Sequence, residues 1–391
     1  YYIFFKVGVN LWNILTNNFN LTTKGNNKMF NFNKFSVNIY ENALNQLKEK
    51  IERIDNIIFK KRDKIKYFVK EIKTRKIKTE FGILIYKRRI YKYFYKGKWK
   101  YVPLVDKQFG VKKWQRIIND LKLKITAEIV KNKRYSDILD MFNCKLHCSS
   151  VSRILRKALI KRKDKKIDLK NCKNLYINLD DAHITLKNKN NKSYLQTVRI
   201  ISFNTGKENN KSLNKKYCYF FLNKKTRGAE FNAFFIKKQI QKFFKNYENI
   251  KLIIGGDSAK WIKKTAKILD GMFIFDRFHA IRELKNNIYC GNRSKESFKN
   301  YLHAKELFLQ GKYNEFITFL KSLQNERIKL RYFINLKNGI LNQNKEWNIG
   351  VSAESDVSRV VKSCLGYGNK TFSFSTFKKI LDLKIMKFNF S

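Results

Sequence analysis

The chain has 391 residues, and its 85 Lys and Arg against 31 Asp and Glu give a formal net charge of +54. This length excludes a mini-protein held together by disulfides and predicts two or three domains with cores of their own. The excess of cations indicates a polyanionic partner such as nucleic acid, because lysines beside phosphates displace counterions. Codon usage in an AT-rich genome would also enrich Lys, Asn, Ile, Phe and Tyr, so charge alone does not establish that partner.

Residues 1–28 are interpreted as a fragment or an upstream extension, because the chain starts with Tyr1 rather than Met. Their apolar stretch is shorter than the ~20 residues of a membrane-spanning helix and contains Lys6, so no membrane association is expected. The six cysteines form no CxxC pair. Reduced thiols and a cytoplasmic location are therefore expected.

Residues 29–110 are expected to form a long helix followed by a small basic β-hairpin. Apolar residues recur at helical spacing over 39–73, with charges between them. Segments 78–89 and 91–101 favour two strands, and Pro103, the only proline, closes the hairpin.

Residues 111–160 are predicted to be helical, with a short helix over 135–142, a break, and a second helix from Ser149. A Ser-rich N-cap after such a break is typical of a helix-turn-helix. In that interpretation the second helix presents four side chains to the major groove of DNA: Ser152, Arg153, Arg156 and Lys157. Plain packing of two helices explains the same pattern. The charge-dense segment 161–173 is expected to be a linker.

Residues 174–391 are expected to form an α/β domain. Three strands come first and alternating helices and strands follow: strands over 174–186, 193–203 and 217–222, a helix over 228–244, a strand over 251–255, a helix over 259–269 and a strand over 272–275. This order is the layout of a ribonuclease-H-like mixed sheet. A helical insertion is expected at about 280–345, and a final helix follows Ser352.

Acidic residues follow two strands that lie side by side in such a sheet. Asp180 and Asp181 come after the first strand. Asp257 follows Gly255 and Gly256 after the fourth strand, where the glycines would let the backbone turn tightly. Each acid alone is more often a turn or capping residue. Together they predict a site for Mg²⁺ or Mn²⁺, because hard oxygen ligands suit these ions and phosphodiester chemistry often uses two of them.

A third carboxylate is needed to hold a second ion, and Glu354 in the first turn of the final helix fits this role. An acid there is also favoured by the helix dipole alone, and Asp356 is a rival candidate. Arg359 and Lys362 of the same helix could contact the DNA backbone.

Four segments resemble the ISLre2-type bacterial transposases, which are also catalogued as the UPF0236 family. They are DDAHITL from Asp180, GDSAKWI from Gly256, DRFH from Asp276 and AESDVS from Ala353. The segments TEFG from Thr79 and YKRR from Tyr86 resemble the N-terminal part of that family. The resemblance covers the chain from about residue 40 onward. Related chains often have another residue at the position of Asp181.

This resemblance implies a DDE transposase whose catalytic and metal-binding acids are Asp180, Asp257 and Glu354. It implies Mg²⁺-dependent DNA cleavage and strand transfer, with element ends and target DNA as partners. It further implies a homo-oligomer that pairs two ends, in the bacterial cytoplasm at the nucleoid. Asp276 and His279 are similar to the D-x-x-H signature of Mutator-like transposases, which supports the active site or the DNA.

Three alternatives stay open at this point. From the residues alone, His279 is equally well a core histidine at a helix start. A ribonuclease-H-like nuclease would need only the cleavage step. A transposase-derived DNA-binding protein could have lost its activity, and a chain that stops soon after the glutamate helix is one form that such a loss could take.

Overall fold

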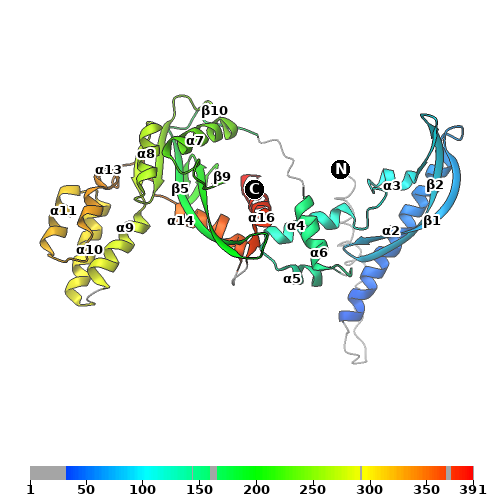
Figure 1. The fold of residues 1–391 in the computed structure, drawn as a ribbon, viewed down its shortest axis with the longest axis horizontal. Helices are drawn as coiled ribbons and strands as arrows, with labels where there is room; N and C mark the ends of the chain where they lie inside the picture. Colours follow the sequence, from blue (N-terminus) through cyan, green and yellow to red (C-terminus); the bar gives the residue numbers. More distant parts are fainter. Residues whose placement is uncertain (1–31, 143, 159–164, 291–292, 367–370, 391) are drawn as a thin grey trace, which may run out of the picture. The chain divides into compact units, whose positions relative to one another are not determined.

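The computed structural model describes residues 32–142, 144–158, 165–290, 293–366 and 371–390 (Figure 1). The chain divides into two compact units, Tyr1–Arg116 and Ile117–Ser391. The expected N-terminal extension, residues 1–28, lies outside the described residues. Every helix in the described part is too short or too polar to cross a membrane. The five-part division expected from the sequence is finer than these two units, and its inner boundaries stay predictions.

The first unit combines a long helix with a three-stranded antiparallel sheet. Its elements are α2 (Phe32–Lys61), β1 (Phe68–Thr79), β2 (Gly82–Tyr95), β3 (Lys98–Val102) and α3 (Leu104–Gln108). The buried carboxylate of Asp106 accepts hydrogen bonds from Arg75 at 3.0 Å and from the Tyr86 hydroxyl at 2.6 Å, and it pairs with Arg88. These partners allow the acid to be buried, since an unpaired buried charge is costly.

The helix predicted over 39–73 is too long. α2 ends at Lys61 and β1 begins at Phe68, so the expected hairpin has a third strand that the sequence analysis missed. A β-bulge between Val69 and Glu71 shifts the register of β1 against β2. The bulge interrupts the two-residue alternation of apolar side chains from which a strand is recognised.

Helices α4 (Asn119–Val130), α5 (Tyr135–Asp140) and α6 (Cys148–Lys157) open the second unit. The expected short helix, break and second helix are therefore present. The side chain of His147, rather than a serine, caps α6 by accepting a hydrogen bond from the Ser149 N–H at 3.3 Å. α4, α5 and α6 share a hydrophobic core with α16 (Phe374–Phe390), a helix that the sequence analysis did not predict.

A six-stranded mixed sheet forms the centre of the second unit. Its strands in spatial order are β12 (Met272–Phe275), β11 (Lys251–Gly256), β5 (Asn174–Lys187), β6 (Ser193–Asn204) and β9 (Lys216–Phe221), with β13 (Phe372–Ser373) also paired to β5. β11 runs parallel to β5 and β12, whereas β6 runs antiparallel to β5 and β9. The expected order of three leading strands and then alternating helices and strands is confirmed.

Two short strand pairs extend beyond this expectation. β7 (Gly206–Glu208) pairs with β8 (Lys211–Leu213), and β4 (Ile167–Asp168) pairs with β10 (Phe244–Lys245). The expected linker over 161–173 therefore contains a strand, while its residues 161–164 lie outside the described part of the chain.

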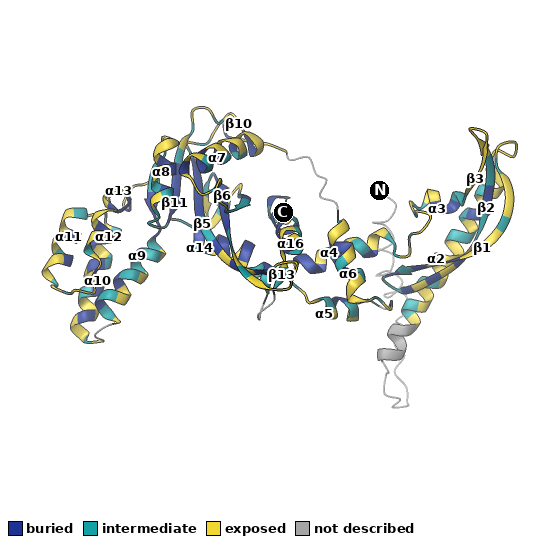
Figure 2. Ribbon diagram, viewed as in Figure 1, coloured by how far each residue is buried: buried dark blue, intermediate teal, exposed yellow. Residues whose placement is uncertain are grey.

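Different helices cover the two faces of the sheet, and β5 is largely buried between them (Figure 2). α7 (Ala229–Phe243) and α8 (Lys260–Ile268) pack against Leu175, Ile177 and Leu179 of β5. The other face packs against the C-terminal helices through Ala182 and Ile184. These helices are α14 (Ala353–Asp356), η2 (Val357–Lys362), α15 (Ser363–Leu365) and α16. Because side chains alternate along a strand, neighbouring residues of β5 face different sets of helices.

A helical segment with a core of its own separates β12 from α14. It comprises α9 (Arg277–Leu284), η1 (Lys285–Tyr289), α10 (Lys295–Leu309), α11 (Tyr313–Ser322), α12 (Leu330–Ile334) and α13 (Lys337–Leu341). This segment corresponds to the helical insertion expected at about 280–345. After it the chain returns to the sheet, where the Asn178 amide of β5 donates to the Ser352 hydroxyl just before α14 at 3.2 Å.

Candidate functional site

Asp180 lies in the middle of β5 and not after its end, since the strand continues to Lys187. The partner strand is the one that ends here: β11 pairs with β5 up to Gly256, which is opposite Leu179. The next residues along the two strands are Asp257 and Asp180, so the register brings them next to each other. The prediction that these two strands are neighbours is confirmed. Asp180 lies beside Asp257 because β11 ends there, and not because β5 ends there.

One carboxylate oxygen of Asp180 is unpartnered. Its Oδ1 accepts a hydrogen bond from the Asp181 N–H at 2.8 Å, whereas Oδ2 is buried without a hydrogen-bond partner among the described residues. Burial raises the pKa of Asp180 to about 7; the Asp181 N–H opposes this shift, and the charges of Asp257 and Glu354 add to it. Asp180 is therefore near enough to two acids of other segments to respond to their charges.

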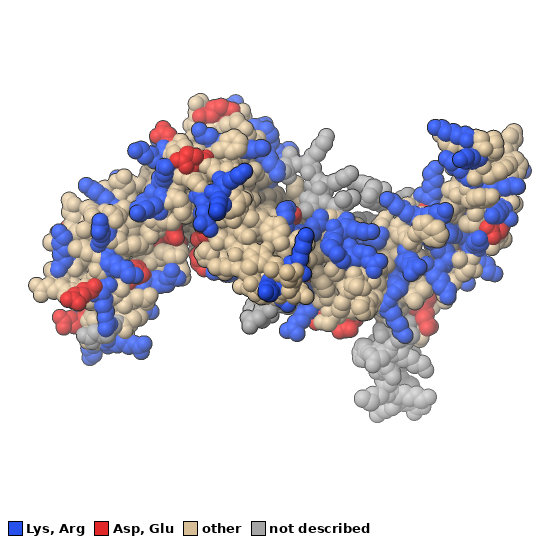
Figure 3. Space-filling view, in the orientation of Figure 1, with Lys and Arg blue, Asp and Glu red and all other residues tan. Residues whose placement is uncertain are grey.

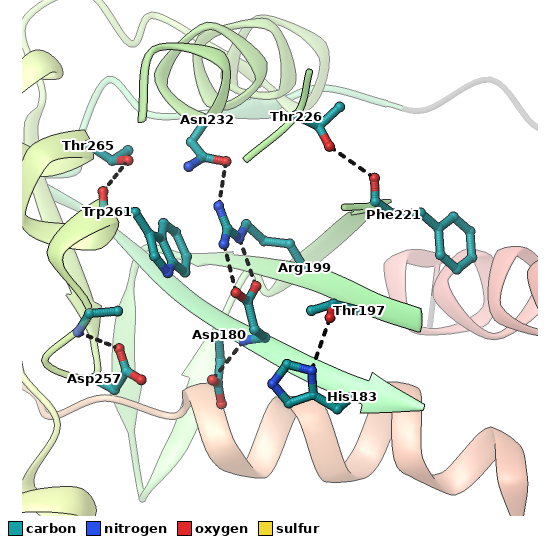
Figure 4. A network of polar contacts seen from close by, with 12 residues as sticks. Asp180, His183, Thr197, Arg199, Phe221, Thr226, Asn232, Asp257, Trp261 and Thr265 are labelled. Carbon is teal, nitrogen blue, oxygen red and sulfur yellow. Dashed lines mark hydrogen bonds and ion pairs between the residues drawn. The ribbon is translucent and has the colours of Figure 1, made fainter. Parts of the chain in front are cut away.

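Asp181 faces the other side of β5 and has both oxygens bonded there. Its two carboxylate oxygens accept hydrogen bonds from Arg199 of β6, both at 2.7 Å. The Arg199 guanidinium also donates to the Asn232 side chain of α7 at 3.0 Å and lies over the Trp261 ring of α8, 3.2 Å from its centroid (Figure 4). This bidentate ion pair uses both oxygens of Asp181, so its carboxylate is less available to a ligand than that of Asp180.

Asp257 follows two glycines whose role is close packing. Both lie inside β11 and neither has a positive φ, so the expected tight turn is wrong. A Cβ on Gly255 would be 2.7 Å from Val351 Cγ2, and one on Gly256 would be 2.8 Å from the Leu179 carbonyl oxygen. Since any side chain would push neighbouring segments apart, the glycines hold β11 close to β5 and to the segment before α14. Asp257 Oδ1 then accepts from the Ala259 N–H at 2.8 Å.

Glu354 and its rival Asp356 lie two residues apart on α14 and differ in environment. Asp356 is 2% exposed and is held by the Ser202 and Ser352 hydroxyls at 2.6 and 2.9 Å, by Lys215 at 2.6 Å and by the Tyr217 hydroxyl at 3.1 Å. Glu354 has a side chain 38% exposed that pairs with Lys362 at 3.0 Å. Asp356 thus anchors the helix to the sheet, and Glu354 is the acid that remains accessible.

Asp276 and His279 form a pair at the start of α9. Asp276 caps this helix by accepting from the Phe278 N–H at 3.0 Å, and its other oxygen lies 2.9 Å from His279 Nδ1. The hydrogen bond with Asp276 raises the pKa of His279, and the charge of Asp180 contributes in the same direction. His279 is thus a hydrogen-bonded histidine at a helix start, and its support of the active site or the DNA stays a prediction.

Comparison with known families adds one assignment. The family model of UPF0236, an uncharacterised protein family, matches residues 29–359. The chain belongs to this family.

Several relatives are UPF0236 proteins of Caldanaerobacter subterraneus subsp. tengcongensis. TTE0402 is 26% identical over 357 residues, which are 87% of this chain and 69% of the relative. TTE2489 is 25% identical over 357 residues, 87% of this chain and 74% of the relative. A third relative, whose name joins eleven designations from TTE0033 to TTE2212, is 25% identical over 354 residues, 87% of this chain and 73% of the relative.

The DNA-contacting side chains expected for this UPF0236 chain lie on two helical segments of the second unit. On α6, Arg153, Arg156 and Lys157 are exposed, and Ser152 is half-buried. On η2, Arg359 is exposed with its guanidinium over the Phe388 ring at 4.6 Å, while Lys362 holds Glu354. Lys and Arg side chains are spread over the visible surface (Figure 3). That these residues bind DNA stays a prediction.

Sequence reasoning missed two cations that define the site, Arg199 and Lys215. Arg199 stands alone among the apolar residues of β6 and lies opposite Asp181 in the register. An isolated arginine in an apolar strand is a signal, because burial requires a charged partner. Lys215 precedes β9 and carries no comparable signal, since it is one of many lysines in the sequence.

The acids of the UPF0236 chain have the donor chemistry, but not the arrangement, of a divalent-cation site. As the side chains lie, no group of three or more His, Cys, Asp and Glu among the described residues could by itself hold a metal ion. The buried Oδ2 of Asp180 has no partner among these residues, and a proton or a cation would neutralise it. Three carboxylates are the oxygen donors that Mg²⁺ and Mn²⁺ prefer.

Proposed function

We propose that this protein is a DDE transposase that catalyses Mg²⁺-dependent DNA cleavage and strand transfer of an insertion sequence. The observation that carries the proposal is the unpartnered Asp180 carboxylate, whose pKa is raised to about 7 by burial and then by the nearby charges of Asp257 and Glu354. A buried carboxylate that responds to other negative charges has a cost in stability, and such costs concentrate at functional sites.

The strand arrangement supports a ribonuclease-H-like catalytic domain. If β5, β6, β9, β11 and β12 are numbered 1 to 5 in chain order, they lie in the sheet in the order 5-4-1-2-3. Only strand 2 runs antiparallel to its neighbours. The acids come from strand 1, the end of strand 4 and a helix that returns after the insertion. This is the placement that the resemblance to ISLre2-type transposases implies.

In this proposal Asp180, Asp257 and Glu354 supply the oxygen ligands. Mg²⁺ bound there would activate an attacking oxygen and stabilise a leaving oxygen at a phosphodiester. Water attacks first and frees a 3′-hydroxyl at the element end, and that hydroxyl then attacks a phosphodiester of target DNA and displaces a 3′-oxygen. Asp356 holds α14 in position, and His279, which Asp276 orients, would donate or accept a proton during these steps.

Two further features fit a mobile element. The net charge of +54 suits a DNA partner. A relative whose name joins eleven designations fits a protein encoded in many gene copies, as insertion sequences are. Pairing two element ends would require a homo-oligomer, and a bacterial protein of this kind would work in the cytoplasm at the nucleoid.

The test is a cleavage and strand-transfer assay with Mg²⁺ and DNA that carries the element ends. Asp257→Asn and Glu354→Gln should each abolish both reactions while leaving DNA binding within a fewfold of wild type. Asp270→Asn is the matched control: it is an exposed acid just after α8 with a φ of +53°, which asparagine tolerates. Cleavage that persists in both active-site variants overturns the assignment.

The same assay separates the alternative functions. Cleavage without joining of the freed 3′-hydroxyl to target DNA identifies a nuclease of this fold. Binding without cleavage in the wild type identifies a DNA-binding protein that has lost its activity. Either result leaves the position of the acids in the fold unchanged, so each is distinct from a wrong choice of residues.

A further inference from the structure

One end of the sheet in the first unit has an exposed cluster of aromatic rings, here named the aromatic end. It consists of Phe68 in β1, Phe94 in β2, and Trp99 and Tyr101 in β3, which are 45, 61, 48 and 54% exposed. β3 is exposed along most of its length (Figure 2). Exposed single apolar side chains are ordinary, but four half-exposed rings together are a feature that marks a binding surface.

The register places these four rings on the same face of the sheet. Phe68 is opposite Lys92, which is opposite Tyr101, and Phe94 is opposite Trp99. Residues directly opposite in paired strands share a face, and so do residues two apart along a strand. The ring centroids of Phe94 and Trp99 are 5.4 Å apart, and those of Phe68 and Trp99 are 6.3 Å apart, both edge to face.

Lysines lie over two of these rings. The Lys92 ammonium is 5.0 Å from the centroid of Trp99, and the Lys70 ammonium is 4.3 Å from that of Tyr101. Segment 92–101, which contains three of the four rings, has four lysines and no Asp or Glu, whereas Lys70 of β1 lies 3.9 Å from Glu71. The aromatic end thus offers flat apolar surfaces, two of them with a lysine over the ring.

We propose that the aromatic end binds single-stranded DNA. Unpaired bases stack on exposed rings, and lysines beside the rings meet the phosphates of the same strand. Base pairs in a duplex hide the base faces, so a duplex would use only the lysines. An acidic protein partner would need only the lysines, and an apolar partner only the rings. The choice of DNA rests on the proposed function, whereas the surface itself is independent of the carboxylate site.

The experiment measures binding of the full chain to a fluorescein-labelled oligothymidylate of about 20 nucleotides, without Mg²⁺, by fluorescence anisotropy. A duplex of equal length is the second probe. Phe94→Ala and Trp99→Ala should each weaken single-strand binding on the order of tenfold, since stacking of one base contributes that much. Duplex binding should change less than about twofold. Trp99→Phe keeps a ring and should retain most of the affinity.

The matched control is Trp114→Ala. Trp114 is 84% exposed with the Lys113 ammonium 5.2 Å from its ring centroid, and it lies outside the cluster. It should leave both affinities unchanged. Phe94→Ser, at the most exposed ring, provides a second variant if removal of Trp99 impairs folding.

Three results would overturn the inference. Equal losses for single strand and duplex would show that only the charge matters, and no loss for either would exclude a DNA surface. If Phe94→Ala or Trp99→Ala changed the molecular mass of the protein in solution but not its affinity for DNA, the aromatic end would be a surface for a second copy of the chain. Because binding is measured without Mg²⁺, a failed cleavage assay leaves this inference intact, and the reverse also holds.

Discussion

Asp180 and Asp181 are adjacent residues of one strand, yet they lie in opposite electrostatic environments. Asp181 on the α7 and α8 face has both oxygens bound by Arg199, while Asp180 on the other face keeps a buried oxygen without a partner among the described residues. A protein that needed two buried acids only for stability would neutralise both. The strand thus separates an acid paired with an arginine from an acid that keeps a free oxygen, as the proposed chemistry requires.

The same separation recurs on α14. Asp356 is enclosed by two serines, a lysine and a tyrosine, whereas Glu354 is accessible and held only by a partly exposed Lys362. On β5 and on α14 alike, an acid with several bonds holds the backbone in place, and a nearby acid on the same element is less engaged. The engaged acids are therefore expected to control folding, and the available acids to control activity.

The largest effect is expected from exchanging Asp180 for asparagine. Metal-ion catalysis contributes several kcal/mol of transition-state stabilisation, so Asp180→Asn should lower the Mg²⁺-dependent cleavage rate by about a thousandfold. Asp181→Asn, assayed well below its melting midpoint, should stay within about tenfold of wild type because it contributes no free oxygen. Cleavage rates on one DNA substrate decide the matter, and a reversed order of the two variants would assign the site to Asp181.

The second effect is on the free energy of unfolding, which substitution of Asp181 should lower more than substitution of Asp180. Asp181→Ala leaves Arg199, which is 2% exposed, buried without its carboxylate, and this should cost about 3 kcal/mol of the free energy of unfolding. Asp181→Leu combined with Arg199→Met removes both charges and should recover most of that loss. Urea unfolding measures each value. If Asp181→Ala were as stable as the wild type, the ion pair between Asp181 and Arg199 would not stabilise β5.

A somewhat smaller effect is expected for Asp356. Asp356→Asn keeps the shape but loses the charge that Lys215 requires, and it should lower the free energy of unfolding by about 2 kcal/mol. Glu354→Gln should change stability by less than about 1 kcal/mol, since it weakens only an exposed ion pair. Ser355→Ala, between the two acids and exposed, is the control. Equal losses for both acids would contradict the division of roles on α14.

Five of the six strands of the sheet could be predicted from the sequence because each contains a run of apolar residues, whereas the two-residue β13 was missed. Met272–Phe275 and the β5 and β11 segments needed no information from elsewhere in the chain. The partition of the acids could not be predicted in this way. Whether Asp180 or Asp181 is paired depends on Arg199, which lies opposite only once β6 has its register.

The same limit applies to the remaining differences. Asp356 is enclosed by residues from β6, β9 and the loop before β9, all more than a hundred positions away in the sequence. α16 went unpredicted although its apolar residues complete the core beside α4 and α6. Long-range contacts decide these features, whereas local pattern decides the type of most elements.

A dependence of stability on pH tests the state of Asp180 directly. Its folded pKa of about 7 exceeds the value of about 3.9 in an unfolded chain, so the folded protein holds a proton that the unfolded chain releases. Stability should therefore fall as pH rises from about 4 to 7 and change little from this cause above 7. His279, whose pKa is also raised, contributes a fall in the same direction, so the informative quantity is the difference between wild type and Asp180→Asn. The variant should melt higher than the wild type at pH 8 and no higher than it at pH 4. Added Mg²⁺ should raise the melting temperature of the wild type at pH 8 and not that of the variant, because the cation would replace the missing proton at Asp180 Oδ2; an equal rise in both proteins would show that the ion binds elsewhere.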